Sequence, residues 1–186
     1  MGKRYTIAYK TGTITPESGT PMSAIRRLVE WFQSLFRPQV ELPPTPGEGI
    51  YLTREQVVAV IKAALGKKWD TLTYIRMADN EYYCPTIAYF LQILGEDETD
   101  RLTYVAEIGD CDDFSWTLKD MFVRDAWRNG RRRAPHCVGV FDYTRKGGRH
   151  SINWVITADK VFRLTEPQTD AWVSLSDVVV ADALIL

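Results

Sequence analysis

Residues 109–116, GDCDDFSW, place a cysteine, Cys111, among three aspartates. Apolar residues at helical spacing follow it and predict a helix that begins at this stretch, with the thiol at its N-terminus. The first turn of a helix carries unpaired backbone N–H groups and the positive end of the helix dipole, which stabilise an anion. Because the thiolate is the reactive form of cysteine, the position predicts a nucleophile if a histidine lies beside it.

The chain has two histidines, His136 and His150, from which this partner must come. His136 follows RRRAP at a loop-to-strand junction and is the weaker candidate. His150 begins the segment HSINWVITADKVFRLTE, in which the apolar residues of two predicted strands occupy even positions: Ile152, Trp154, Ile156, Phe162 and Leu164. Even-numbered residues therefore face the core, and His150 and Glu166 share that face.

The length of the loop between these strands decides which residues lie opposite each other. With a three-residue loop at 157–159, His150 lies directly opposite Glu166, with Cβ atoms about 5 Å apart. The carboxylate would then orient the imidazole, which predicts a catalytic triad of Cys111, His150 and Glu166. Asn153 is the competing third member, but it should face the other side of the strand unless a two-residue turn or a bulge changes the register.

Helical patterns precede strand patterns along the chain. Apolar spacing, capping residues and glycine stops predict helices over 23–36, 53–66, 85–95 and 111–129. A linker rich in proline and glycine at 37–49 divides the chain into an N-terminal arm with an amphipathic helix, 1–49, and a catalytic domain, 50–186. Short segments rich in Val, Ile and aromatic residues then predict a meander of antiparallel strands, and the tail adds either a strand or a short helix at 175–182. We therefore expect an α+β fold in which an N-terminal helical half packs on a C-terminal antiparallel sheet.

The composition narrows the partners. Among 186 residues, 23 basic side chains nearly balance 24 acidic ones, so no general electrostatic attraction to nucleic acid or to an anionic membrane is expected. Three cysteines argue against a disulfide scaffold. Because the sequence shows neither a signal peptide nor a membrane-spanning segment, a cytoplasmic protein is expected. The oligomeric state stays open, with a dimer as one option.

Three segments together resemble a known family. GDCDDF, then HSIN, then a strand ending in EPQTD are similar to the papain-like cysteine protease family that includes the C-terminal domain of a mushroom agglutinin and uncharacterised bacterial and phage relatives. GDCDD is more loosely similar to bacterial transglutaminase-like cysteine proteinases. The resemblance covers residues 50–180 and implies a papain-like fold, with Cys111 as the nucleophile, His150 as the base and Glu166 as the orienting acid.

The resemblance also implies a requirement for Ca²⁺, or Mn²⁺ in its place, beside the cleft. Hard cations take clustered carboxylate oxygens, and five acidic residues are candidate ligands: Asp110, Asp112, Asp113, Glu166 and Asp170. Negative charge beside Cys111 would raise the pKa of its thiol, and a bound cation would cancel that effect. Calcium is therefore expected to activate the nucleophile.

These residues lead to one predicted function and its alternatives. The main prediction is a calcium-dependent cysteine hydrolase, a peptidase or amidase, that acts on a peptide or amide substrate through a thioester. A transglutaminase-like acyl transferase would share the first step. A catalytically dormant module with a phage-structural or binding role is the remaining alternative, because Val105 stands where papain has its oxyanion-binding glutamine.

Overall fold

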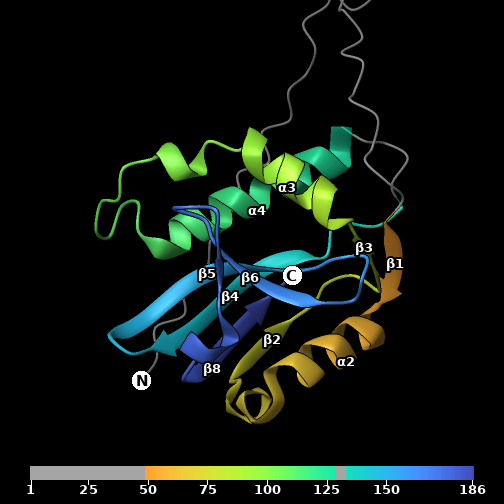
Figure 1. Ribbon diagram of the computed structural model, residues 1–186, viewed down its shortest axis with the longest axis horizontal. Helices are drawn as coiled ribbons and strands as arrows, with labels where there is room; N and C mark the ends of the chain where they lie inside the picture. The colour runs from red at the N-terminus through yellow and green to blue at the C-terminus, as the bar shows by residue number, and fades with distance from the viewer. Residues whose placement is uncertain (1–48, 129–132) are drawn as a thin grey trace, which may run out of the picture. The chain divides into compact units, whose positions relative to one another are not determined.

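The computed structural model describes residues 49–128 and 133–186 (Figure 1). The chain divides into two units, Met1–Pro43 and Pro44–Leu186, and all described residues belong to the second. The predicted arm at 1–49, apart from its last residue, lies outside the described residues, and so does its predicted helix.

The α-helices begin where the sequence supplies caps. Within the described residues they are α2 (Arg54–Leu65), α3 (Ile87–Glu96) and α4 (Cys111–Arg128). At the start of α2, Thr53 and Gln56 exchange side-chain-to-backbone hydrogen bonds, which is the capping box that the sequence predicts. Thr86 caps α3 by accepting from the Tyr89 N–H. None of the described helices is long and apolar enough to cross a membrane.

The strands lie before, between and after these helices in the sequence. The described strands are β1 (Ile50–Thr53), β2 (Tyr74–Arg76), β3 (Glu81–Cys84), β4 (Val138–Arg145), β5 (Gly148–Ile156), β6 (Phe162–Glu166), β7 (Ala171–Val173) and β8 (Val180–Ile185). Short 3₁₀ helices lie at η1 (Gly66–Thr71), η2 (Thr99–Arg101) and η3 (Leu175–Asp177). The tail therefore combines a 3₁₀ turn with a last strand.

One six-stranded sheet has the order β2-β8-β4-β5-β6-β7, while β1 pairs with β3. The predicted antiparallel meander is confirmed for β4 through β7. The expectation of a purely antiparallel sheet is wrong at one edge, where β2 runs parallel to β8. A parallel neighbour requires a long connection, and here α3 and α4 both lie in the sequence between β2 and β8.

Helices cover both faces of this sheet (Figure 1). α3 and α4 share one apolar cluster with Val138 and Val155, whereas α2 shares another with Trp154 and other even-numbered residues of β5. Odd-numbered residues of β5, such as Ser151 and Asn153, are consequently buried as well. The α+β class is confirmed, with the sheet as the middle layer.

Close packing around Trp154 depends on a glycine. A Cβ at Gly139 would lie 2.1 Å from the Ile185 carbonyl oxygen and 2.5 Å from the Trp154 indole nitrogen. Only a residue without a side chain lets the indole cross β4, where its N–H donates to the Val140 carbonyl at 3.2 Å. Burial of each large side chain in this core stabilises the fold by about 1.5–3 kcal/mol.

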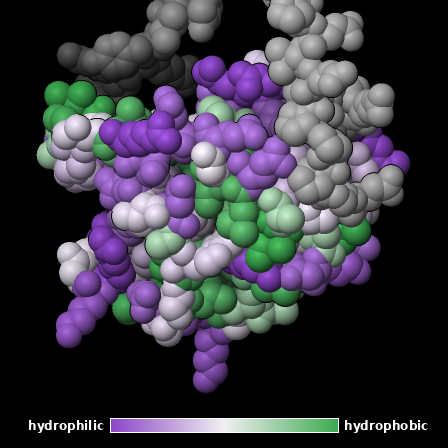
Figure 2. Space-filling model, turned by 45° about the horizontal axis from the view of Figure 1, so that its top comes forward, coloured by the Kyte–Doolittle hydropathy of each residue, from purple (hydrophilic) through white to green (hydrophobic). Residues whose placement is uncertain are grey.

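The surface also displays large apolar groups. Figure 2 shows hydrophobic areas interspersed among hydrophilic ones on the face viewed. Exposed aromatic residues include Trp116, Trp127 and Trp172. Aromatic surface of this kind is available for contact with ligands.

Candidate functional site

Cys111 is the first residue of α4, as the sequence predicts, but its thiol is not ionised by that position. Burial raises the pKa of Cys111 most, and the charges of Asp110 and Asp112 raise it further. The backbone amide of Ser151 acts in the opposite direction and lowers the pKa of this thiol. The net direction is upward, so the protonated thiol is the form present at neutral pH and the predicted thiolate is not favoured.

His150 and Glu166 lie in direct contact. Nε2 of His150 is 2.6 Å from Oε2 of Glu166, and both side chains are largely buried. The expected loop and register are wrong, because Ile156 pairs with Phe162 across a five-residue connection. The shift is two residues relative to the expected pairing, so the parity of the strands is preserved and the two long side chains still meet diagonally.

The longer connection between β5 and β6 is held by its own polar network. Asp159 accepts hydrogen bonds from Thr157 at 2.6 Å and from Arg163 at 2.7 Å. These hydrogen bonds, above all those from Arg163, lower the pKa of Asp159. Lys160 adopts a positive φ of 60°, which closes the turn. Asp159 and Lys160, within the sequence TADK, were the residues that could have indicated a turn longer than three residues.

Asn153 lies on the opposite face from His150, as predicted. Its side chain is fully buried and donates to the backbone carbonyls of Ser115, at 2.9 Å, and Gly139, at 3.2 Å. Ser115 belongs to α4, so Asn153 attaches this helix to the sheet. Its role is structural rather than that of a third triad member.

Cys111 and His150 lie at the same end of β5 without bonding to each other. The backbone amide of Ser151, the residue that follows His150, is near enough to lower the pKa of the Cys111 thiol. Among residues 49–128 and 133–186, no hydrogen bond joins the sulfur to the imidazole. The structure thus brings the three predicted residues into one region, but it pairs only the histidine with the glutamate.

The five predicted metal ligands occupy three different places. Ligand atoms of Asp110, Cys111 and Asp112 lie within 4.8 Å of one another, and these are the only such group among the described residues. Asp113 instead accepts the backbone N–H of Asp110 at 3.3 Å, next to the helix start. Glu166 is engaged by His150.

Asp170 belongs to a separate acidic group. Burial, followed by the charges of Asp100 and Asp97, raises its pKa to about 6. It sits in the turn between β6 and β7 with a positive φ of 57°. The predicted convergence of all five carboxylates is therefore wrong, because the turn directs Asp170 towards η2 rather than towards the start of α4.

A groove next to Glu166 was missed by sequence reasoning. Its volume is about 500 Å³, and its lining includes Tyr143, Arg145, Lys146, Glu166, Trp172 and Asp177. We call it the Trp172 groove. The indole is 43% exposed and stacks on Phe90 with ring centroids 5.5 Å apart, so one side of the ring is held by the core. Trp172, an exposed tryptophan in a three-residue edge strand, was the only feature of the sequence that could have indicated this groove.

Comparison with known proteins finds solved structures with a similar fold. No family model and no curated protein matches this sequence. A solved structure described as a PSL1a–E64 complex is 22% identical with a TM-score of 0.61, covering 73% of this chain and 51% of that chain. The lectin of Polyporus squamosus, bound to the human-type influenza-binding epitope Neu5Acα2-6Galβ1-4GlcNAc, is 19% identical with a TM-score of 0.57, covering 71% and 49%. At these identities the similarity shows the fold alone, and the chain spans about half the length of each.

These neighbours correct the predicted family and activity. The second is described as a lectin bound to a sugar epitope, and neither description names a peptidase. The assignments as a papain-like protease, as a cysteine hydrolase and as an enzyme are contradicted, and a peptide or amide substrate has no support. The order of Cys, His and Glu along the sequence predicted the contact between His150 and Glu166 correctly. It did not show whether the thiol of Cys111 is ionised, and for this reason the predicted activity was wrong.

Proposed function

We propose that this chain is a carbohydrate-binding module whose sugar site is the Trp172 groove. The observation that carries the proposal is a groove of about 500 Å³ that is lined by charged and polar side chains and by Trp172, a residue that is partly exposed and whose indole rests on Phe90. The C–H face of a pyranose stacks on such a ring, and its hydroxyl groups pair with the polar groups at the edge. A groove of this volume matches the size of ordinary small-ligand sites.

Glu166 has a defined place in this proposal. Its carboxylate lines the groove while its Oε2 is held by His150. A carboxylate that is fixed in this way can accept hydrogen bonds from two neighbouring sugar hydroxyls without losing side-chain freedom on binding. His150 acts as the positioning residue, and Cys111 remains a protonated, dormant thiol nearby.

The charges of the groove favour particular sugars. The lining holds two basic side chains, Arg145 and Lys146, and two acidic ones, Glu166 and Asp177, of which Glu166 is paired with His150. An acidic sugar presents a carboxylate that an arginine can bind through two parallel hydrogen bonds. We therefore propose that a sialylated glycan binds more tightly than its neutral core.

Calorimetry with two probes tests this function. The trisaccharide Neu5Acα2-6Galβ1-4GlcNAc should bind more tightly than Galβ1-4GlcNAc, and Trp172→Ala should weaken both by roughly 10-fold or more. Trp116→Ala is the matched control, since Trp116 is 46% exposed on α4 and lies outside the groove lining. Absence of binding to both probes, or equal loss in the two variants, would contradict the proposal.

The calcium prediction stands as a second proposal, limited to Asp110 and Asp112. A hydrogen bond with Asp110, together with burial, raises the pKa of Asp112, and ligand atoms of the two residues lie within 4.8 Å of each other. A divalent cation could bind between the two carboxylates, because carboxylate oxygens suit Ca²⁺ and Mn²⁺, whereas a protonated thiol does not. The donor set present therefore fits a hard cation through two oxygens.

Thermal unfolding with and without saturating Ca²⁺ or Mn²⁺ tests this cation site. A cation that binds only the folded chain raises the melting temperature by mass action. Asp112→Asn should abolish the increase, while Asp170→Asn should retain it because Asp170 lies in the other acidic group. An unchanged melting temperature in the wild-type protein would exclude the site.

A further inference from the structure

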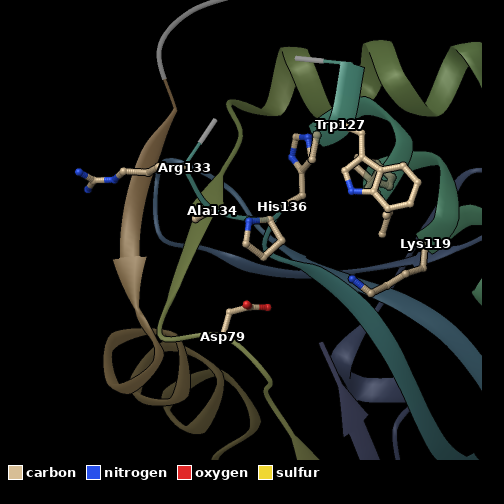
Figure 3. A pocket seen from close by; sticks show the side chains of 10 residues that line it. Asp79, Lys119, Trp127, Arg133, Ala134 and His136 are labelled. Atoms are coloured by element: carbon tan, nitrogen blue, oxygen red, sulfur yellow. The ribbon is translucent and has the colours of Figure 1, made fainter. Parts of the chain in front are cut away.

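A second cavity lies on the α4 side of the molecule and shares no lining residue with the Trp172 groove. Its volume is about 310 Å³. Lys119 and Trp127 enter it from α4, Asp79 from the loop between β2 and β3, and His136 from the segment before β4 (Figure 3).

Lys119 brings a poorly solvated ammonium group to this cavity. Burial lowers the pKa of Lys119 to about 8, although the charge of Asp79 acts in the opposite direction. The group is still mostly protonated at neutral pH. An ammonium has three N–H donors, and among the described residues its one acceptor is the Val138 carbonyl, at 2.7 Å. A buried cation without further partners is costly, so the site favours an anionic oxygen.

Asp79 presents the opposite charge across the same space. Its backbone is fixed, because its N–H donates to Tyr82 Oη at 2.9 Å and its carbonyl accepts from Arg54 at 2.9 Å. Its carboxylate has no hydrogen-bond or ion-pair partner among residues 49–128 and 133–186. Figure 3 shows this carboxylate and the Lys119 ammonium directed towards a common space below Trp127.

The remaining wall is mostly apolar. Trp127 is 79% exposed, and Phe122, Ala126 and Pro135 also line the cavity. Arg133 contributes no free charge, because it pairs with Glu81 at 2.8 Å and lies over the Tyr51 ring. His136 also lines the cavity and pairs with Asp125 at 2.6 Å, so the lining offers a ligand one anion, Asp79, one cation, Lys119, and an apolar surface.

We propose that this cavity binds a small zwitterion with an apolar side group, of the chemical class of a free α-amino acid. The ligand ammonium pairs with Asp79, its carboxylate pairs with Lys119, and its side group packs against Trp127 and Pro135. The two protein charges face the space without forming an ion pair with each other, which is the complement of a molecule that carries both charges. The proposal is independent of sugar binding at the Trp172 groove.

Four probes that differ by one group at a time test the recognition. L-phenylalanine carries both charges, 3-phenylpropionate lacks the ammonium, phenethylamine lacks the carboxylate, and L-phenylalaninamide keeps the carbonyl without its charge. Titration up to about 10 mM, followed by the NMR shift of the Trp127 indole N–H, covers the affinity expected for a ligand of this size. L-phenylalanine should bind roughly 10-fold more tightly than each of the other three.

Two substitutions assign the charges. Asp79→Asn, on an exposed loop, should bring L-phenylalanine down to the affinity of 3-phenylpropionate, and Lys119→Gln should bring it down to that of phenethylamine. Asp70→Asn, an exposed aspartate in η1, is the control and should change nothing. Equal binding of all four probes, no shift with L-phenylalanine, or an unchanged Asp79→Asn variant would overturn the proposal.

Discussion

Two histidines of this protein make the same contact in different surroundings. In each case Nε2 lies 2.6 Å from a carboxylate oxygen, that of Asp125 for His136 and that of Glu166 for His150. His136 packs against the rings of Tyr83, Tyr89 and Phe122, and its partner belongs to α4. Within the described part of the chain His150 has one ring neighbour, Tyr143, and its partner lines the Trp172 groove. A buried His–carboxylate pair therefore indicates no function by itself; the groups around the pair decide it.

The largest expected difference between the two pairs is in stability. His136→Ala should lower the free energy of unfolding by about 3–4 kcal/mol, because it leaves a cavity among aromatic rings and removes the imidazole that joins the segment before β4 to α4. His150→Ala should cost about 1–2 kcal/mol, since its neighbourhood opens to the groove. Urea unfolding of both variants measures the difference.

A control separates loss of the ring contacts from loss of the ion pair. Asp125→Asn keeps the volume of the side chain and its hydrogen bond from Tyr89, now accepted by an amide oxygen. Its cost should be smaller than that of His136→Ala. If His150→Ala proved as destabilising as His136→Ala, the contrast between a structural pair and a groove-side pair would be wrong.

The second expected difference is in ligand binding. Glu166→Gln should weaken binding of Neu5Acα2-6Galβ1-4GlcNAc by about 10-fold, because a neutral amide accepts hydrogen bonds more weakly than a carboxylate. Asp125→Asn should leave the affinity unchanged, since Asp125 does not line the groove. Calorimetry on both variants measures this, and a loss of affinity that appears in Asp125→Asn alone would reverse the assignment.

Sequence patterns predicted the structural features that depend on the local spacing of residues. The capping box at Thr53, the start of α4 at Cys111 and the shared face of His150 and Glu166 all follow from the periods of helices and strands. Parity survives a register shift of two residues, which explains why the contact is present although the predicted loop is too short.

Properties set by distant neighbours could not be predicted in this way. The pKa of Cys111 depends mainly on burial under the rest of the fold, which no local pattern reports. Asp125, the partner of His136, lies on α4 at a position that no motif in the sequence marks. The Trp172 groove is lined by residues of β4 and the turn after it, of β6, of β7 and of η3, which are separated in the sequence.

Asp170 extends the comparison to a carboxylate that has no histidine partner. Burial and two like charges raise its pKa to about 6 in the folded chain, above the ordinary 3.8. A raised carboxyl pKa contributes stability that is fully present below the unfolded pKa and is lost as the pH rises through the folded pKa. Above about pH 6 the ionised group therefore destabilises the fold.

Asp170→Asn removes this effect and should stabilise the protein at a pH of about 8 relative to a pH of about 4. The gain should stay below about 1 kcal/mol, because Asp170 is only partly buried and solvent screens its charge. Asparagine also tolerates the positive φ of this position. Urea midpoints of the variant and of the wild-type protein at the two pH values measure the difference, and a variant that is less stable at the higher pH would contradict the sign.

The smallest expected effect is on the reactivity of the Cys111 thiol, which tests whether the His150–Glu166 pair influences that thiol. Because burial and the charges of Asp110 and Asp112 raise the pKa of the thiol above its ordinary 9.0, alkylation by iodoacetamide should accelerate with pH well into the alkaline range. Asp110→Asn removes one of the negative charges and should speed the reaction about twofold at a pH of about 8. Cys84 and Cys137 are fully buried and should stay unlabelled, so they serve as internal controls when the three cysteines are measured by mass spectrometry.

His150→Ala should leave the alkylation rate of Cys111 unchanged, since no hydrogen bond joins the imidazole to the sulfur within the described residues. A marked slowing in His150→Ala would show that the imidazole ionises the thiol, and the two histidines would then differ in chemistry as well as in surroundings.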